Sequence, residues 1–291
     1  MKRSQTAPAK STAPPATGRA SAPPPSGRRH DREFVGGLAR GLAVIRCFGA
    51  EAPEMTLSEV AARTALSPAT ARRALLTLEA LGYVRQNRRR FVLRSQVLAL
   101  GAAYLAAMNL KDLVQPHLQA LNARFGDASS LTVLEGNDVV YVAHAAMQNR
   151  ARRLRQSVGS RLPAHAASTG HVLLSHLPDA AQADYLRQAP FPAFTANTPS
   201  NAETLRLVFR QARAQGWALA CDIIEYGVIA LAVPIRDAAG HVFAAINCSA
   251  DSTAIRPAQM EQTRLAPLRA AASAIGEDLA RYPALAHSVG R

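Results

Sequence analysis

The stretch of residues 57–94 constrains the fold of this chain more than any other part of the sequence. It reads LSEVAARTALSPATARRALLTLEALGYVRQNRRRFVLR. A short helix is expected at its start, because Thr56 or Ser58 can act as the N-cap and Thr56 has a glutamate three residues later, as in a capping box. After a break at Leu66, a second helix enters through Ser67, with proline at its first position. The two helices and the tight break predict a helix-turn-helix.

The second helix, which Gly82 ends, has two different faces when it is wound at about 100° per residue. One face is apolar and is expected to enter the core, with Ala71, Ala74, Leu75, Leu78 and Leu81. The other carries Ala69, Thr70, Arg72, Arg73 and Thr77, together with Leu76. An outward arginine pair near a helix start is suited to gripping guanine or phosphate in the major groove of DNA.

A basic hairpin is expected after this helix, with two short strands around a turn at residues 86–90. A helix pair followed by such a hairpin indicates a winged helix-turn-helix. Arginines at the wing contact phosphates or reach into the minor groove, so they add affinity more than sequence choice. Residue 65 is alanine, where the turn of such a motif usually has glycine.

The net charge of +14 is concentrated in the first third of the chain. Residues 1–94 hold 17 basic and 6 acidic residues, whereas residues 95–291 hold 17 and 14. This asymmetry indicates an anionic partner for the N-terminal part. The first 33 residues, rich in Pro, Ala and Ser, are expected to be a disordered basic tail.

A helix is also expected in GGLARGLAVIRCFG, ending near Gly49, with an apolar stripe of Leu38, Leu42 and Ile45. Two helices should follow the hairpin in residues 95–125. Beyond them, strands alternate with helices near 169–177, 179–188, 201–215 and 257–281. The fold class is therefore α+β, with an antiparallel sheet in the second half.

Several function classes are excluded by what the sequence lacks. No run of about 18 apolar residues and no apolar leader is present, so we expect a cytoplasmic protein with no membrane partner. Three distant cysteines indicate neither disulfides nor a zinc site. Ser168 with His165 or His171 lacks a nucleophile-elbow motif and an acid to orient the histidine, and His165, His171 and His176 have no usual metal spacing. We expect no catalysis, no metal and, without phosphate-binding glycine motifs, no cofactor.

Five segments together resemble the IclR family of bacterial transcription regulators over about residues 34–282. They are GLARGLAVIRCF, TLSEVAARTALSPATARRALLTLEALGYV, FVLRSQVLALG, VGSRLPAHAASTGHVLLS and GWALACDIIEYGVIALAVPIRDAAGHVFAAINCSA. The stretches RLPAHAASTGHVLL and EYGVIALAVPI look most like the subgroup that governs aromatic-acid catabolism through protocatechuate, 4-hydroxybenzoate or β-ketoadipate.

The resemblance implies a winged helix-turn-helix at 34–94, a linker helix at 95–110 and a GAF-like effector-binding domain at 111–282, followed by a short tail at 283–291. It also implies a homodimer or a dimer of dimers on palindromic, double-stranded promoter DNA, with a small organic acid as effector. Two positions depart from the subgroup where the pocket is expected: Ile223 replaces an acidic residue and His144 replaces an arginine.

The candidate site residues form two sets. We expect DNA contacts from Ser67, Ala69, Thr70, Arg72, Arg73, Thr77, Arg88, Arg89, Arg90 and, near the start of the first helix, Arg40. We expect ligand contacts from Tyr141, His144, His165, Ala167, Ser168, Thr169, Gly170, Asn247 and Ser249. In the second set, the free N–H groups at a helix start beside Ser168 and Thr169 are suited to a carboxylate.

Several alternatives stay open from the residues alone. Ser168 and Thr169 could be a purely structural cap, and Asn247 with Ser249 could face solvent. The cluster Arg150, Arg152, Arg153 and Arg155 is either a cation source for an acid ligand or a solvated charge run. A rival function is a small-molecule-binding or catalytic domain whose basic N-terminus binds a membrane or scaffold.

Overall fold

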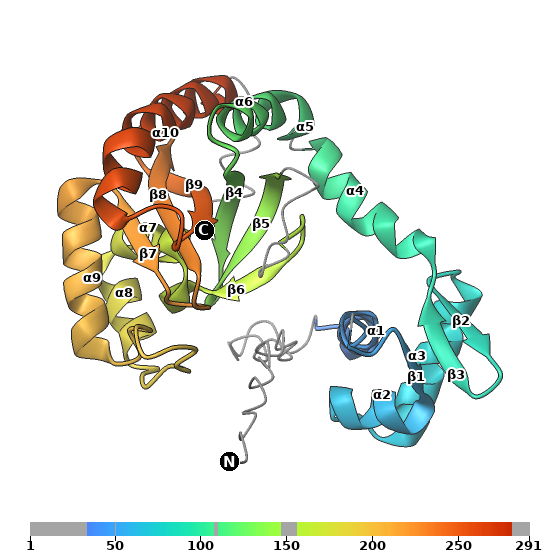
Figure 1. Cartoon of the computed structure of the whole chain (residues 1–291). Helices are drawn as coiled ribbons and strands as arrows, with labels where there is room; N and C mark the ends of the chain where they lie inside the picture. The colour runs from blue at the N-terminus through green and yellow to red at the C-terminus, as the bar shows by residue number, and fades with distance from the viewer. Residues whose placement is uncertain (1–33, 50, 108–109, 147–155, 281–291) are drawn as a thin grey trace, which may run out of the picture. The chain divides into compact units, whose positions relative to one another are not determined.

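The computed structural model describes residues 34–49, 51–107, 110–146 and 156–280. The chain divides into two compact units between Ala102 and Ala103 (Figure 1). Both predicted tails and the arginine cluster of residues 150–155 lie outside the described residues.

The first unit is the predicted winged helix. Its elements are α1 (Gly36–Arg46), β1 (Glu54–Thr56), α2 (Leu57–Thr64), α3 (Pro68–Ala80), β2 (Val84–Asn87) and β3 (Arg90–Leu93). The strands form an antiparallel sheet in the order β1-β3-β2. Val60, Leu75 and Phe91 are among the buried side chains that hold the helices to the sheet. After β3 come a 3₁₀ turn, η1 (Ser95–Val97), and α4 (Leu98–Ala107).

Three details of this unit differ from the sequence expectation. Leu38 and Leu42 are 64% and 45% exposed, because α1 contacts the core along the side of Val44, which is fully buried. Leu81 is 60% exposed, because α3 ends at Ala80 and Leu81 lies in the cap where the chain turns away. The hairpin turn is shorter than 86–90, since β2 and β3 leave only Arg88 and Arg89 between them.

The second unit is a six-stranded antiparallel sheet with helices on both faces. After α5 (Leu110–Leu113) and α6 (Gln115–Phe125) come β4 (Ala128–Glu135), β5 (Asp138–Ala145), β6 (Arg161–Pro163), η2 (Ala164–Ala166), α7 (Ser168–Ser175), α8 (Asp179–Leu186), α9 (Ala202–Gln215), β7 (Ala218–Cys221), β8 (Val228–Arg236), β9 (Val242–Asp251) and α10 (Pro257–Ala280). The strand order is β6-β5-β4-β9-β8-β7. The α+β class and the antiparallel sheet are confirmed.

Two apolar clusters cover the two faces of this sheet. Helices α6 and α10 pack on one face through residues such as Leu118 and Ile275. Helices α7, α8 and α9 pack on the other through residues such as Leu174 and Phe209 (Figure 1). Strand side chains alternate between the faces, so β4, β5, β7, β8 and β9 each supply residues to both clusters. The sequence does not predict β1 or β6, because three-residue strands are too short to show this alternation.

Candidate functional site

The start of α3 is built as the sequence predicts. Ser67 Oγ accepts the N–H of Thr70 at 3.3 Å and lies 2.9 Å from Thr70 Oγ1, and a proline occupies the first turn. The chain turns sharply between α2 and α3, because Ala65 at the end of α2 adopts a left-handed backbone conformation with φ 54°. A left-handed backbone conformation costs an L-residue about 1–2 kcal/mol of conformational energy. Glycine avoids this cost, so it is the usual residue in the turn of such a motif.

The outer face of α3 carries the predicted DNA-contact residues. Ala71, Leu75 and Leu78 are buried, and this fixes the rotation of the helix. The opposite side is left accessible: Ser67, Ala69, Arg72, Arg73 and Thr77 are exposed and Thr70 is half-buried. Leu76 is exposed on the same side. Arg40 on α1 is exposed as well.

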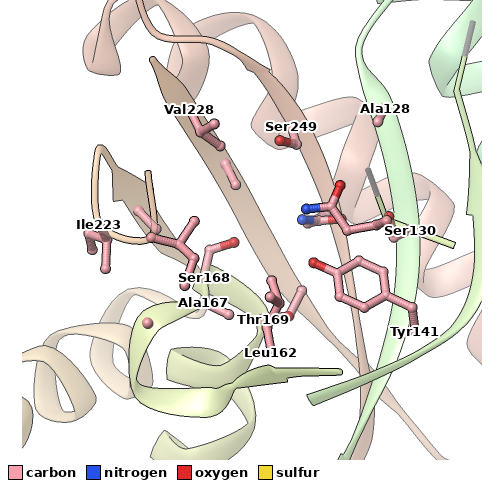
Figure 2. A pocket seen from close by; sticks show the side chains of 16 residues that line it. Ala128, Ser130, Tyr141, Leu162, Ala167, Ser168, Thr169, Ile223, Val228 and Ser249 are labelled. Carbon is pink, nitrogen blue, oxygen red and sulfur yellow. The ribbon is translucent and has the colours of Figure 1, made fainter. Parts of the chain in front are cut away.

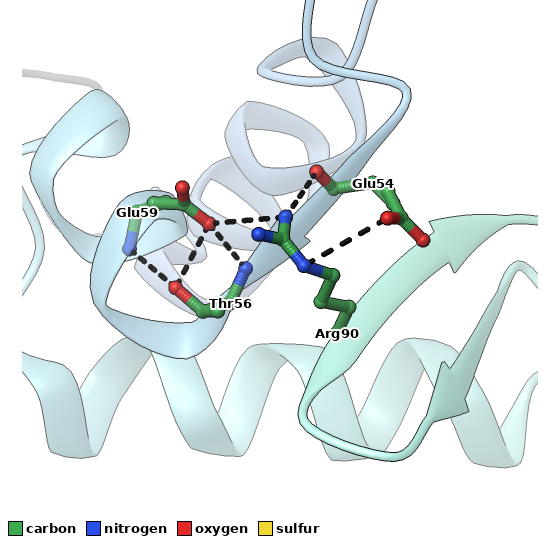
Figure 3. Close-up of polar contacts among 4 residues, drawn as sticks. All are labelled: Glu54, Thr56, Glu59 and Arg90. Atoms are coloured by element: carbon green, nitrogen blue, oxygen red, sulfur yellow. Dashed lines mark hydrogen bonds and ion pairs between the residues drawn. The ribbon is translucent and has the colours of Figure 1, made fainter.

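Arg90 faces away from the tip of the wing, unlike Arg88 and Arg89. Figure 3 shows its guanidinium between Glu54 and Glu59: Nη1 donates to the Glu54 carbonyl at 3.3 Å, and carboxylate oxygens of both glutamates lie 3.7 Å from its nitrogens. The side chain therefore ties β3 to β1 and α2. Arg88 and Arg89 are exposed in the turn between β2 and β3, at the tip of the wing.

Glu59 completes the capping box that the sequence predicts for α2. Its Oε2 accepts from the Thr56 N–H at 2.7 Å and from the Thr56 hydroxyl at 2.9 Å, while its own N–H donates to Thr56 Oγ1 at 3.4 Å. These hydrogen bonds, first the one from the backbone N–H, lower the pKa of Glu59. Thr56, rather than Ser58, is the N-cap.

The second candidate site is a hollow between the sheet and the start of α7, which we call the α7 hollow. The space between its atoms, counted together with the solvent at its open side, is about 490 Å³. Figure 2 shows Tyr141 reaching it from β5 and Ser168 from α7. Its lining residues are Ala128, Ser130, Tyr141, Gln156, Leu162, Ala166, Ala167, Ser168, Thr169, Ala220, Ile223, Ile224, Val228, Ala230, Asn247 and Ser249.

Two buried polar atoms at this hollow lack a hydrogen-bond partner among the described residues. They are Ser168 Oγ and Asn247 Oδ1, on side chains that are 2% and 5% exposed. Burying a polar group without a partner costs about 1–3 kcal/mol. The first N–H groups of a helix also lack partners within it, and Ala167 at the N-cap of α7 supplies no side-chain cap. Donors and acceptors thus gather around the hollow.

Six of the nine predicted ligand residues line the α7 hollow: Tyr141, Ala167, Ser168, Thr169, Asn247 and Ser249. The solvent-facing alternative for Asn247 is wrong, because its side chain is buried between β4 and β8. None of the described lining residues carries a charge. Burial raises the pKa of Tyr141, so its hydroxyl stays protonated over the physiological range.

The other three predicted ligand residues do not line the α7 hollow, each for a different reason. His144 lies on β5, opposite Ser130 of β4, and its Nδ1 is 2.9 Å from Ser130 Oγ. His165 is turned into the protein, where Nε2 lies 2.8 Å from the Pro192 carbonyl and the ring stacks on Phe191. Gly170 is a packing position, because a Cβ there would meet the Ala164 carbonyl oxygen at 2.0 Å.

His171 is also structural. Its ring is fully buried and Nε2 lies 2.7 Å from the His165 carbonyl oxygen, which calls for a protonated Nε2. Burial lowers the pKa of His171 to about 4. Among the described residues, no cluster of three His, Cys, Asp or Glu side chains could hold a metal ion.

Sequence reasoning missed most of the sheet residues at the α7 hollow, above all Ser130. Ala128 and Ser130 alternate on β4 and point to the same face as Thr132. Small residues at alternate positions of an apolar strand could have indicated this part of the hollow. A strand face that packs tightly against a helix usually carries larger side chains at those positions. Ile223 was flagged as a pocket position, and it does line the hollow.

A winged helix with an arginine face, joined in one chain to a sheet domain with a partly polar hollow, is the arrangement of a DNA-binding transcription regulator. The comparisons with known proteins agree. Residues 37–88 match the IclR helix-turn-helix domain, and residues 102–277 match the bacterial transcriptional regulator IclR C-terminal domain. The chain belongs to the IclR family. Its members and relatives are transcription regulators, so the predicted absence of catalysis is confirmed at the level of the family.

Relatives of known role cover most of the chain. The Pca regulon regulatory protein of Pseudomonas putida is 38% identical over 243 residues, which are 84% of this chain and 83% of that protein. The p-hydroxybenzoate hydroxylase transcriptional activator of Acinetobacter baylyi is 33% identical over 77% of this chain and 84% of its own. A solved IclR homolog of Microbacterium hydrocarbonoxydans, complexed with 4-hydroxybenzoate, has a TM-score of 0.71 at 28% identity, over 84% and 98% of the two chains.

The family does not support the rival function with a membrane-bound N-terminus. None of the helices in the described part of the chain combines the length and apolar character needed to span a bilayer.

Proposed function

We propose that this regulator binds a palindromic promoter site as a homodimer or a dimer of dimers, and that a small aromatic carboxylic acid in the α7 hollow alters that binding. The observation that carries the ligand half is the pair of buried, unsatisfied atoms at the hollow, Ser168 Oγ and Asn247 Oδ1, which lack partners among the described residues. A ligand that satisfies them recovers the cost of their burial.

The start of α7 is the expected carboxylate site. Its first N–H groups and the Ser168 hydroxyl are donors, and the helix N-terminus favours negative charge. The described lining offers no cation, so neutral donors must hold the acid there. Apolar walls that include Leu162, Ile223 and Val228 suit a flat hydrocarbon ring. A relative whose name refers to p-hydroxybenzoate, and a neighbour complexed with 4-hydroxybenzoate, support the same ligand class.

The DNA half of the proposal rests on the outer face of α3. Each chain offers one such helix, with Arg72 and Arg73 exposed. A symmetric dimer presents two, and its DNA site then has two inverted half-sites. Because it acts on bacterial promoters, we place the protein in the cytoplasm. The acid acts by favouring one of two dimer arrangements that differ in operator affinity.

Ligand binding is tested by thermal shift and calorimetry of the full chain with benzoate, 4-hydroxybenzoate, protocatechuate and adipate. An aromatic acid should raise the melting temperature by mass action, and adipate should do so less. Ser168→Ala should weaken every aromatic acid. Ser175→Ala is the matched control, since Ser175 lies buried on the same helix but donates to the Val172 carbonyl, away from the hollow. If no aromatic acid shifts melting, this ligand class is wrong.

DNA binding is tested by selecting bound duplexes from a random library. A symmetric assembly should enrich an inverted repeat, and an aromatic acid should change the affinity for it. A single, non-repeated motif would contradict the dimer on a palindrome.

A further inference from the structure

The loop between α8 and α9 joins two parts of the wall of the α7 hollow that lie far apart in the sequence. One part is the start of α7 with the short turn η2 before it, and the other is the irregular segment 222–227 between β7 and β8. In Figure 2, Ile223 of that segment and Tyr141 lie on opposite sides of the hollow. Residues 190–198 of the loop, which we call the strap, contact both parts of the wall.

The first end of the strap packs on η2 through His165, a side chain that is 1% exposed. Nε2 of His165 lies 2.8 Å from the carbonyl oxygen of Pro192. The imidazole ring stacks on Phe191 and Phe194, with ring centroids 4.9 and 6.0 Å apart, and Phe191 also stacks on Tyr185 of α8. Because η2 leads directly into α7, these contacts fix the strap to the side of the hollow where α7 begins.

The second end of the strap holds the segment 222–227 by hydrogen bonds to its backbone. Thr198 Oγ1 donates to the carbonyl oxygen of Ile223 at 2.6 Å. Thr195 Oγ1 donates to the nearer of two carbonyl oxygens, that of Asp222, also at 2.6 Å. A strap N–H donates in addition to the Tyr226 hydroxyl at 3.2 Å. The strap therefore sets where the backbone that carries Ile223 lies.

Thr198 is the centre of this connection. Its side chain is buried, and the same oxygen that donates to Ile223 accepts the N–H groups of Phe194 at 3.0 Å and Thr195 at 2.9 Å. A hydroxyl has one donor and two acceptor sites, so all three are in use. One hydroxyl thus shapes the turn of the strap and ties that turn to the wall of the hollow.

The two ends of the segment 222–227 are held by contacts of their own. Asp222 Oδ1 accepts from the Gly227 N–H at 2.7 Å and from the Ser252 hydroxyl at 2.8 Å, and the Asp222 N–H donates to the Val228 carbonyl at 2.8 Å. These bonds do not involve the strap. Loss of the strap contact should therefore release the middle of the segment, at Ile223, and leave its ends in place.

We propose that Thr198 is a positioning residue that controls which ligand sizes the α7 hollow accepts. It does not line the hollow, but through the strap it fixes Ile223, which does, relative to the start of α7. A wall that is held by its backbone cannot retreat before a larger ring system, whereas a released wall can. This inference rests on the proposed aromatic-acid function.

The first experiment measures, by calorimetry on the full chain, the affinities of benzoate and 2-naphthoate. Thr198→Val should lower the ratio of the benzoate affinity to the 2-naphthoate affinity by roughly fivefold, about the effect of one hydrogen bond. The smaller acid must then order a loose wall, and the larger acid gains room. Thr198→Ser keeps the hydroxyl and should keep the ratio of wild type.

Thr64→Val is the matched control for the first experiment. Thr64 is half-buried in the DNA-binding unit, and its Oγ1 donates to the Val60 carbonyl at 2.7 Å. The substitution removes a hydroxyl of the same kind far from the strap in sequence, so the affinity ratio should stay that of wild type. Melting temperatures check that each variant is folded. If Thr198→Val lacks a cooperative transition, Thr195→Val takes its place and is judged by the same ratio.

The second experiment needs no ligand and follows amide hydrogen exchange in the full chain. In Thr198→Val the N–H groups of Phe194 and Thr195 lose their acceptor, and the segment 222–227 loses its tie to the strap. Exchange in residues 190–198 and 222–228 should become faster by roughly fivefold. Exchange in residues 57–64 should not change. Thr198→Ser should exchange like wild type.

The outcomes separate this inference from the function beneath it. If aromatic acids bind and Ser168→Ala weakens them all, but Thr198→Val leaves the affinity ratio unchanged, the size control by Thr198 is overturned and the proposed function stands. Unchanged exchange in residues 222–228 of Thr198→Val overturns it as well, because the strap then does not hold the wall. If Thr198→Ser behaves as Thr198→Val, the hydroxyl is not the cause. If no aromatic acid binds to wild type, the proposed function fails and the size control fails with it.

Discussion

Gly170 lies directly against the backbone of Ala164: a Cβ built on Gly170 would be 2.0 Å from the Ala164 carbonyl oxygen and 2.6 Å from its Cα. Real Cβ contacts of this kind do not occur, so the close approach requires glycine. It presses the first turn of α7 onto η2 and sets where Ser168 and Thr169 stand at the α7 hollow. A residue that does not line the α7 hollow thus fixes the position of residues that do.

Gly170→Ala should destabilise the effector domain and disrupt the hollow. Overpacking of this kind costs about 1–3 kcal/mol or more, and the obstacle is backbone, which cannot rotate away. We expect a lower melting temperature and loss of aromatic-acid binding. Gly41→Ala is the control, since nothing lies within 4 Å of a Cβ there; in helix α1 it should be neutral or stabilising by up to about 1 kcal/mol. Equal stability of the two variants would argue against the packing role.

The double variant Arg72→Ala, Arg73→Ala should lose specific DNA binding. Both side chains are exposed on α3, and each good base contact is worth about 1–3 kcal/mol, so we expect at least about a 100-fold loss in an operator shift assay. Melting temperature and acid binding should be unchanged. Arg206→Ala, on the exposed side of α9 in the other unit, is the charge-matched control. Wild-type operator affinity in the double variant would exclude α3 as the recognition helix.

Arg89 and Arg90 should differ in how much each contributes to the salt dependence of DNA binding. Arg89 is exposed in the turn, so Arg89→Ala should weaken all DNA sequences alike and reduce the slope of log K against log salt by about 1, as for one lost phosphate contact. Arg90 is engaged by Glu54 and Glu59, so Arg90→Ala should leave that slope nearly unchanged. A slope change of about 1 for Arg90 would place it on the phosphate backbone after all.

His171 should contribute to acid sensitivity. Burial lowers its pKa to about 4 in the folded protein, against about 6.5 when unfolded. The unfolded chain therefore binds more protons between these values, and stability falls as the pH drops from about 6.5 to 4, by up to roughly 3 kcal/mol. His165 and His176, with pKa values also lowered by burial, act in the same direction.

The measurement compares melting temperatures at pH 7 and pH 4.5. His171→Gln keeps an N–H for the His165 carbonyl and cannot be protonated, so its decrease on acidification should be smaller than that of wild type. His241→Gln, on a side chain that is 79% exposed, should follow wild type more closely. An identical acid loss in wild type and His171→Gln would show that His171 is not a source of the sensitivity.

Much of the DNA-binding unit could be predicted because its signals are local. Thr56 and Ser67 cap their helices through residues three positions away. Such contacts join residues that are close in the sequence, so they can be predicted from it. What the sequence did not show are contacts between residues that lie far apart in it. Arg90 looked equivalent to Arg88 and Arg89, but Glu54 on β1, 36 residues earlier, accepts a hydrogen bond from it. Leu38 and Leu42 formed an apolar stripe, but the position of α3 decided that Val44 enters the core.

The α7 hollow shows the same division. The motif around Ser168 and Thr169 was visible as a helix start beside small residues, and Asn247 and Ser249 as alternating polar positions on a strand. Ser130 drew no attention, because its importance comes from its neighbours on β5 and β9, 14 and 117 positions away.

By itself, the sequence determined the order of most of the elements and the two-part organisation, because capping residues, strand alternation and charge distribution act over a few residues. Its resemblance to known regulators predicted the family. Only the tertiary structure decided which polar side chains share the hollow: it placed Ser130 between His144 and Asn247, turned His165 inward, and made Gly170 a packing position. The physical reason is that strand register and helix-on-sheet packing join residues far apart in the chain, and the free energy of burying polar atoms depends on those partners.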